Sequence, residues 1–120
     1  MNKIQIILES ESNNFLPYEE IPFLINWDLQ DLKENKVEVH LFWYTKGCGI
    51  EDLEIIETKH FNIAAEKGQK KLMFNAPQYP YSFSGKYVSV IWAIEAVFEK
   101  SKISSMVTFD ITPFRKKIVL

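Results

Sequence analysis

The nearest approach to a catalytic arrangement in this sequence is formed by Lys36, Glu38 and His40. They alternate along one expected strand, so their side chains lie on the same face of it. Such a face could place a histidine base beside an orienting carboxylate. A working base also needs a nucleophile or a metal ion, which this spacing does not supply. We therefore interpret these residues as part of a solvated sheet face.

The second chemical candidate is the glycine-rich segment at residues 47–52, which contains Cys48, the one cysteine of the chain. A nucleophilic thiol usually has a helix N-terminus or several cations beside it, and here Lys46 stands alone. The segment has too few oxygen ligands for a calcium loop and lacks the third glycine of a phosphate loop. We interpret it as a structural turn whose glycines permit a tight reversal.

Histidine and cysteine are too few to suggest a metal site. With two histidines and one cysteine, and no paired spacing, a zinc site is not indicated, and His60 beside Lys59 is expected at the surface. We predict no catalytic residue, no metal and no cofactor. A hydrolase built on Cys48 and His40 remains the third function class, behind two kinds of binding protein.

Composition predicts a single globular domain with no nucleic-acid partner. The 120 residues can bury one core, and 47% of them are apolar and 14% aromatic. A net charge of −2 gives no field to attract nucleic acid. One cysteine excludes an intrachain disulfide and favours a reducing compartment, so the expected location is cytoplasmic. No apolar run approaches the length of about 18 residues that spans a bilayer, so we expect no signal peptide and no direct membrane insertion.

Apolar residues recur at every second position through most of the chain, which is typical of strands. Pro22 suits the start or edge of its strand. A β-bulge is expected near Ile56 and Glu57, where the apolar residues change from one face of the strand to the other. Turns are expected at residues 30–35 and 45–52 and around Gly68. The expected strands cover residues 4–8, 21–29, 37–44, 53–63, 72–74, 87–98 and 106–111.

The strand at 87–98 is apolar on both faces, so we expect it to be central and covered on both sides. About seven short strands and no credible helix predict an all-β, antiparallel two-sheet β-sandwich, with a closed barrel as the alternative architecture. The sandwich spans residues 1–113. The basic and apolar tail at 114–120 lies outside the pattern and is either a frayed end, a tether or an added strand.

Two segments carry a resemblance to a known family. LMFNAP at 72–77 and YSFSGKYVSVIWAIEA at 81–96 resemble the arrestin-like domain, in which a strand ends in proline, a loop carries serine, an aromatic residue and glycine, and a long strand begins Gly-Lys-Tyr. The resemblance covers about a fifth of the chain closely. It implies an immunoglobulin-like β-sandwich that serves as a scaffold or adaptor without enzymatic activity.

The chain departs from that family in two ways. Members usually carry two sandwiches in tandem, whereas this chain has one, so a mechanism that rotates two domains is not carried over. The family's phosphate-sensing basic residues have no counterpart here, so recognition of phosphate groups is not carried over either.

Aromatic residues supply the candidate partner-binding site. Five of them fall on the face opposite the core or in a proline-rich loop, where they could anchor a partner or could simply cover the end of the sandwich. Three tryptophans fall on the apolar phase and are expected in the core. The partner-binding candidates are Phe42, Tyr44, Tyr79, Tyr81 and Phe83, and the core tryptophans are Trp27, Trp43 and Trp92.

The sequence therefore favours a non-catalytic, protein-binding adaptor whose partner is unidentified. The alternative is a carbohydrate-type ligand-binding module that uses the exposed aromatics, with Phe42 and Tyr44 on a sheet face as the platform. A homodimer formed through open sheet edges is a further possibility.

Overall fold

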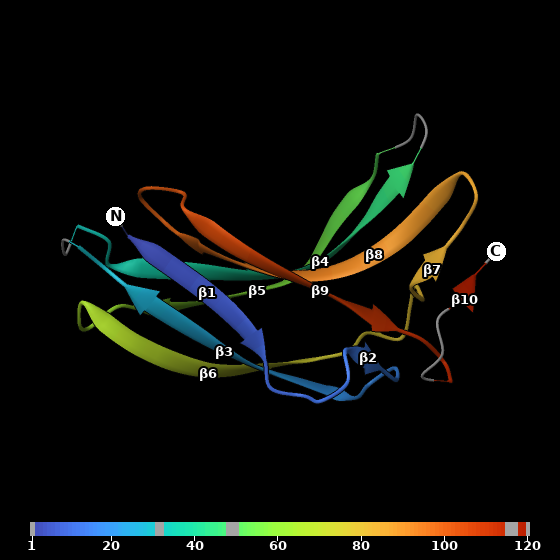
Figure 1. Cartoon of the computed structure of the whole chain (residues 1–120), viewed down its shortest axis with the longest axis horizontal. Coiled ribbons are helices and arrows are strands. Elements are labelled where there is room, and N and C mark those ends of the chain that lie inside the picture. Colours follow the sequence, from blue (N-terminus) through green and yellow to red (C-terminus); the bar gives the residue numbers. More distant parts are fainter. Residues whose placement is uncertain (1, 31–32, 48–50, 115–117, 120) are drawn as a thin grey trace.

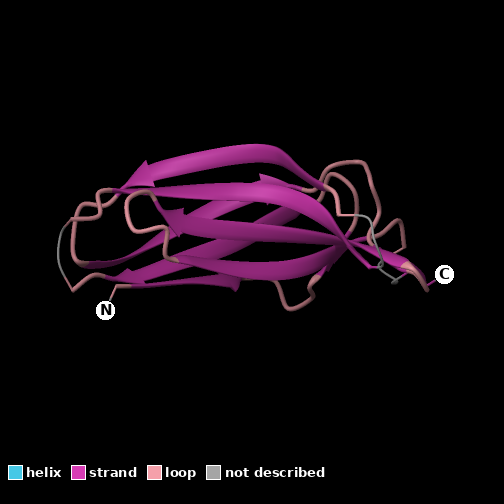
Figure 2. Cartoon of the chain, turned by 90° about the horizontal axis from the view of Figure 1, so that it is seen from above, coloured by secondary structure: helices cyan, strands magenta, loops and turns pink. Residues whose placement is uncertain are grey.

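The computed structural model describes residues 2–30, 33–47, 51–114 and 118–119, which form an all-β domain without helices (Figures 1 and 2). Seven described strands have six residues or more, and three have two residues each. The longer strands are β1 (Lys3–Leu8), β3 (Glu20–Asp28), β4 (Lys36–Gly47), β5 (Leu53–Asn62), β6 (Lys67–Asn75), β8 (Val88–Phe98) and β9 (Ser104–Ile111); the short ones are β2 (Asn14–Phe15), β7 (Phe83–Ser84) and β10 (Ile118–Val119).

The strands form the two sheets of a β-sandwich. The smaller sheet has the order β1-β3-β6, and in the larger one β8 pairs with β4 on one side and with β7 and β9 on the other, while β5 follows β4. All pairings between the longer strands are antiparallel. The predicted antiparallel two-sheet sandwich is therefore confirmed.

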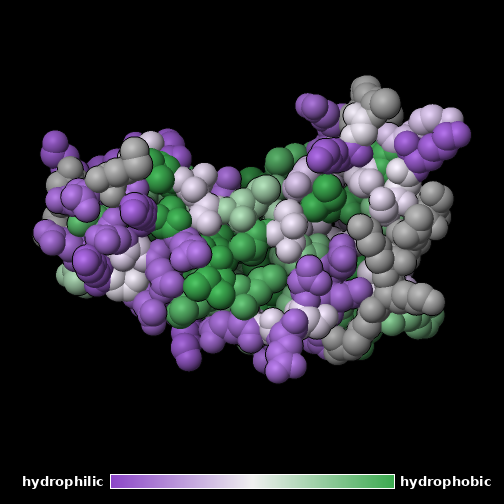
Figure 3. Space-filling model, in the orientation of Figure 1, coloured by the Kyte–Doolittle hydropathy of each residue, from purple (hydrophilic) through white to green (hydrophobic). Residues whose placement is uncertain are grey.

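The core lies between the two sheets and follows the alternation of the sequence. Phe23 and Ile25 of β3 belong to the same core cluster as Leu41 of β4 and Ile94 of β8, and all four side chains are fully buried. Trp92 is fully buried as expected, while Trp27 and Trp43 are partly buried and pack against the core. Figure 3 shows apolar side chains gathered in the middle of the visible face, where β1 and β9 lie side by side (Figure 1).

The larger sheet is longer than the sheet that covers it. Residues 37–41 of β4 and 94–98 of β8 lie against the smaller sheet, and we name this part the covered half. Beyond it β4, β5 and β8 bend away from β3 and β6 (Figure 1). We name that end the open half; it comprises residues 42–47 of β4, 53–56 of β5 and 88–92 of β8.

A β-bulge in β5 marks the boundary between the halves. Leu41 pairs with Glu57 and the next residue, Phe42, pairs with Ile55, so Ile56 is the extra residue. The bulge was predicted at this position, because a switch of apolar phase within one strand requires an added residue.

Several predictions at element boundaries are wrong. Gly68 lies inside β6 rather than in a turn, and a Cβ there would come within 2.5 Å of the Trp27 ring, so the glycine makes room for an indole. Gly47 is still in β4 rather than in the turn, although it has a positive φ of 157°, and the backbone oxygen of Tyr87 lies so close that a Cβ would clash with it, so glycine is required there. The other turn glycine, Gly49, lies outside the described residues with Cys48.

The strand β8 is central in the larger sheet, as predicted, but no further sheet or helix among the described residues covers its outer face. Ile91 and Val97 on that face are partly exposed, and Ala93 is buried among its neighbours in the sheet. Part of the C-terminal tail joins the sandwich, since Ile118 and Val119 pair in parallel with Phe83 and Ser84.

Candidate binding groove

The five aromatic residues predicted to bind a partner do not form one surface. Phe42 and Tyr44 lie on the outer face of the larger sheet, with ring centroids 6.0 Å apart, and Phe42 is only 7% exposed. A flat sugar platform needs exposed rings, so Phe42 is a poor member of one. Tyr44 is partly exposed beside it.

The other three aromatics come from the segment that follows β6. Tyr79 is 71% exposed and Tyr81 37%, whereas Phe83 is partly buried in β7 opposite Val90. Phe83 lines a small hollow with Lys86 and Tyr87. Of the five candidates, Tyr79 alone lines the larger groove described next.

The groove lies where the open half diverges from the rest of the sandwich and holds about 690 Å³. Its floor is the inner face of the open half, and its wall is the segment at residues 77–80. Most of its lining is aromatic or aliphatic, with a carboxylate, a hydroxyl and an amide among them. The lining residues are Trp43, Thr45, Glu54, Ile56 and Val90 on the floor and Pro77, Gln78, Tyr79 and Pro80 on the wall.

Hydrogen bonds hold the wall in place. Pro80 O accepts a bond of 2.8 Å from the indole Nε1 of Trp92, and the Tyr18 hydroxyl donates one of 2.8 Å to Gln78 Oε1. Ser82 exchanges two bonds with Ile111, in which the Ser82 N–H donates to Ile111 O and the Ile111 N–H donates to Ser82 Oγ. The groove is therefore formed before any ligand arrives, which lowers the entropy cost of binding.

Two tryptophans stand opposite each other on neighbouring strands and differ in one respect. Trp43 of β4 pairs with Trp92 of β8, and the Trp92 indole N–H has its acceptor in the wall. The Trp43 Nε1 is buried, and no acceptor for it is found in the described part of the chain. A buried donor without an acceptor costs about 1–3 kcal/mol, so it indicates a position where an added acceptor would stabilise the protein.

Sequence reasoning missed Trp43 as a site residue because it falls on the apolar phase of β4 and was assigned to the core. The lengths of the strands could have indicated Trp43 as a site residue. The alternation in β4 and β8 continues for more residues than β1 or β6 can cover, so the last inward residues must extend beyond the smaller sheet.

His40 and its neighbours lie on the outer face of the covered half. His40 Nε2 is 3.6 Å from Glu38 Oε2, and Nδ1 is 3.0 Å from Thr58 Oγ1. His60 is exposed opposite Glu38 on β5. Within the described ranges there is no group of three histidine, cysteine or acidic residues that could hold a metal ion.

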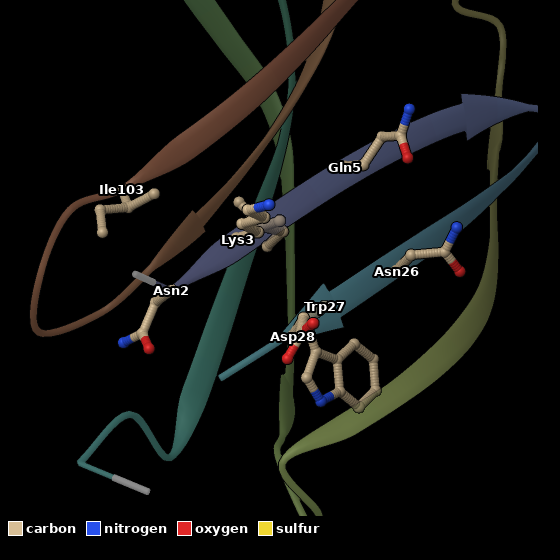
Figure 4. A pocket seen from close by; sticks show the side chains of 8 residues that line it. Asn2, Lys3, Gln5, Asn26, Trp27, Asp28 and Ile103 are labelled. Atoms are coloured by element: carbon tan, nitrogen blue, oxygen red, sulfur yellow. The ribbon is translucent and has the colours of Figure 1, made fainter. Parts of the chain in front are cut away.

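A second cavity, of about 540 Å³, lies at the other end of the molecule (Figure 4). Gln5 and Asn26 stand on the neighbouring strands β1 and β3, with Asn2, Trp27 and Ile103 around them. Asn26 Oδ1 is buried, and no donor reaches it from the described residues. Lys3, Ile4 and Asp28 complete the lining, and this cavity offers less apolar surface than the groove.

Comparisons with known proteins show the fold. No described protein family matches the sequence, and no curated protein matches it. Among solved structures, the chain is similar to the sporulation control protein Spo0M from Bacillus subtilis, with 16% identity and a TM-score of 0.60 over 98% of this chain and 49% of that one. The chain thus spans about half the length of Spo0M.

Two further structures share the fold at lower identity. The CARDB domain of the PF1109 protein from Pyrococcus furiosus, solved in complex with di-metal ions, has 9% identity and a TM-score of 0.53 over 93% of this chain and 88% of that domain. A beta-glucosidase from Listeria innocua has 10% identity and a TM-score of 0.52 over 99% of this chain and 17% of the enzyme.

The described residues contain no helix long and apolar enough to cross a membrane.

Proposed function

We propose that this protein is a non-catalytic adaptor of the cytoplasm that binds a protein partner through the groove of the open half. The observation that carries the proposal is a preformed, largely apolar groove of about 690 Å³ at an end of the sandwich that the second sheet does not cover. Its volume lies in the range of about 300–1,000 Å³ that is typical of ligand sites.

The lining supports a polypeptide ligand. Trp43 and Tyr79 offer aromatic surface for an apolar anchor, and aromatic residues at interfaces bury much area at a small entropy cost. Thr45 and Gln78 provide polar groups at the rim. The arrestin-like segments at 72–77 and 81–96 support the same reading, because they flank the wall of the groove and include Val90 of its floor.

A comparative pull-down from the source cell tests the proposal. Wild-type protein, Ile56→Lys and Tyr87→Ala are immobilised in equal amounts, and retained proteins are quantified by mass spectrometry. Ile56 lies in the groove, while Tyr87 is 69% exposed and lies outside it, so Tyr87→Ala is the matched control. We expect a partner that wild type and Tyr87→Ala retain and Ile56→Lys loses.

The interaction is then measured with the purified partner by isothermal titration calorimetry. Equal binding to all three proteins, or no reproducible partner, would contradict the proposal. Circular dichroism of Ile56→Lys checks that the variant keeps its fold.

A carbohydrate-type ligand is the second candidate function. It is favoured by the exposed Tyr79 ring beside three hydrogen-bonding side chains, those of Thr45, Glu54 and Gln78. Binding on a glycan array that Tyr79→Ala abolishes and Phe42→Ala preserves would establish it. If no glycan on the array is bound, binding of a protein partner is retained as the proposed function.

A further inference from the structure

The strand β5 has one free edge in the open half. Among the described strands, β5 pairs with β4 alone and ends the larger sheet. Its second half is held against β6, where the Lys59 ammonium donates to Met73 O and lies over the Phe74 ring. Its first half has no such contact in the described structure, and Leu53 and Ile55 are 62% and 52% exposed.

The backbone groups at this edge point outward. Thr45 N–H donates to Asp52 O at 2.9 Å, so the backbone of Asp52 faces β4. Backbone groups alternate in direction along an antiparallel strand, and the groups of Leu53 and Ile55 therefore face away from β4. An exposed edge of this kind is a template for another strand.

Neither lysine nor proline protects residues 51–57 from pairing with another strand. Natural edges carry lysine, proline or a bulge, and here the bulge and Lys59 come only after Ile55. Residues 51–57 instead carry four carboxylates and no cation: Glu51, Asp52, Glu54 and Glu57. The ion pairs found in the described part of the chain use other carboxylates.

We infer that the free edge of β5 at Leu53–Ile55 receives an extended segment of the protein partner as an added strand, and that this segment carries lysine or arginine among apolar residues. The inference rests on the proposed function and names the mode of binding at the same site. An added strand places alternate side chains on the two faces of the sheet. Those on the inner face enter the groove beside Ile56, and those on the outer face cover Leu53 and Ile55.

The charges argue against a second copy of this chain as the occupant. Pairing two β5 edges would bring four carboxylates of one copy beside four of the other, and like charges in such proximity oppose association. A basic segment meets the same carboxylates with opposite charge.

The experiment uses a display library of random twelve-residue peptides, selected against the full chain. We expect enriched peptides to alternate apolar residues with lysine or arginine. Synthetic versions are then titrated into the isotope-labelled protein, and amide hydrogen exchange is followed by NMR. On binding, exchange at Leu53 and Ile55 should slow at least about tenfold, because new hydrogen bonds protect these amides.

Two proline substitutions give a matched pair. Ile55→Pro removes an outward N–H in the open half, and His60→Pro removes one on the same edge in the covered half, while the ladder to β4 keeps its donors. Peptide affinity should fall at least about tenfold in Ile55→Pro and stay within about twofold in His60→Pro.

The outcomes separate the two proposals. In one outcome, the peptides bind and their affinity falls in Ile56→Lys, but the amides of Leu53 and Ile55 exchange as fast as before. This outcome would overturn strand addition and keep the groove as the site. Protection of both amides with equal affinity for Ile56→Lys would support strand addition and count against the groove. Failure to enrich basic peptides, or a dimer that protects the same amides without peptide, would overturn the inference.

Discussion

The two halves of the larger sheet are built from the same strands and have different surroundings. In the covered half, Val37, Val39 and Leu41 of β4 are fully buried against the smaller sheet. In the open half, the inward residues Trp43 and Thr45 of the same strand line a groove. The same alternation of side chains therefore produces core where the second sheet covers the strand, and the lining of a groove where it does not.

The comparison also holds at the edge strand. Lys59 and Phe61 of β5 make contacts with Phe74 and Trp27, so this half of the strand closes the sandwich. Leu53 and Ile55 of the same strand remain exposed. We therefore expect stability to depend mainly on the covered half.

The largest difference in stability between the halves is expected when one isoleucine is truncated in each of them. Ile94→Ala removes a fully buried side chain and should lower the free energy of unfolding by about 2–5 kcal/mol. Ile55→Ala removes a side chain that is 52% exposed and should cost less than about 1 kcal/mol. Urea denaturation followed by tryptophan fluorescence measures both, and equal losses would remove the distinction between the halves.

The paired tryptophans give the next largest effect. Trp92→Phe loses the bond to Pro80 O as well as packing, and we expect a loss of about 2–3 kcal/mol. Trp43→Phe makes the same change of side chain but removes a donor that lacks an acceptor, so the loss should be under about 1 kcal/mol. Thermal unfolding of both variants tests this order, and a larger loss for Trp43→Phe would contradict it.

Substitution of Glu34 tests how much the far end of the covered half contributes to stability. Its buried carboxylate accepts hydrogen bonds from the N–H groups of Lys100 and Ser101 and so holds the turn between β8 and β9. Glu34→Ala should cost about 1–3 kcal/mol, because those donors lose their acceptor. Glu54→Ala, an exposed carboxylate of the open half, is the control and should change stability by less than about 0.5 kcal/mol. Chemical denaturation distinguishes the two.

The most local effect is expected at Gly47, near the tip of the open half. A Cβ there would clash with the backbone oxygen of Tyr87, so Gly47→Ala must separate β4 from the start of β8 locally. We expect a loss of about 1–3 kcal/mol, with NMR shift changes confined to the open half. Shift changes that spread to Ile94 or Phe98 would show that the two halves are coupled.

Much of the fold follows from local patterns in the sequence. The alternating residues of β1, β4, β8 and β9 predicted strands, and the phase switch at Ile56 predicted the bulge. Gly68 was misassigned because its role depends on Trp27 of another strand, which sequence spacing does not reveal.

The candidate site could be predicted only in part. Tyr79 was selected because it stands in a proline-rich loop, and the structure places it in the groove. Phe42 was selected by its phase, but neighbours in the sheet bury it to 7% exposure. The position of a residue in the alternating pattern specifies the face of the sheet on which its side chain lies. The exposed fraction of that side chain also depends on the neighbouring strands.

Alternation along each strand was enough to predict β structure and the central place of β8, because periodicity and apolar content act locally, and it left a closed barrel open beside the two-sheet arrangement. Where the smaller sheet ends over the larger one depends on contacts between distant segments, and this end point separates the inward residues that form core from those that line the groove. Trp43 and Trp92 share phase and residue type, and they differ because the covering and the acceptor come from segments distant in the chain.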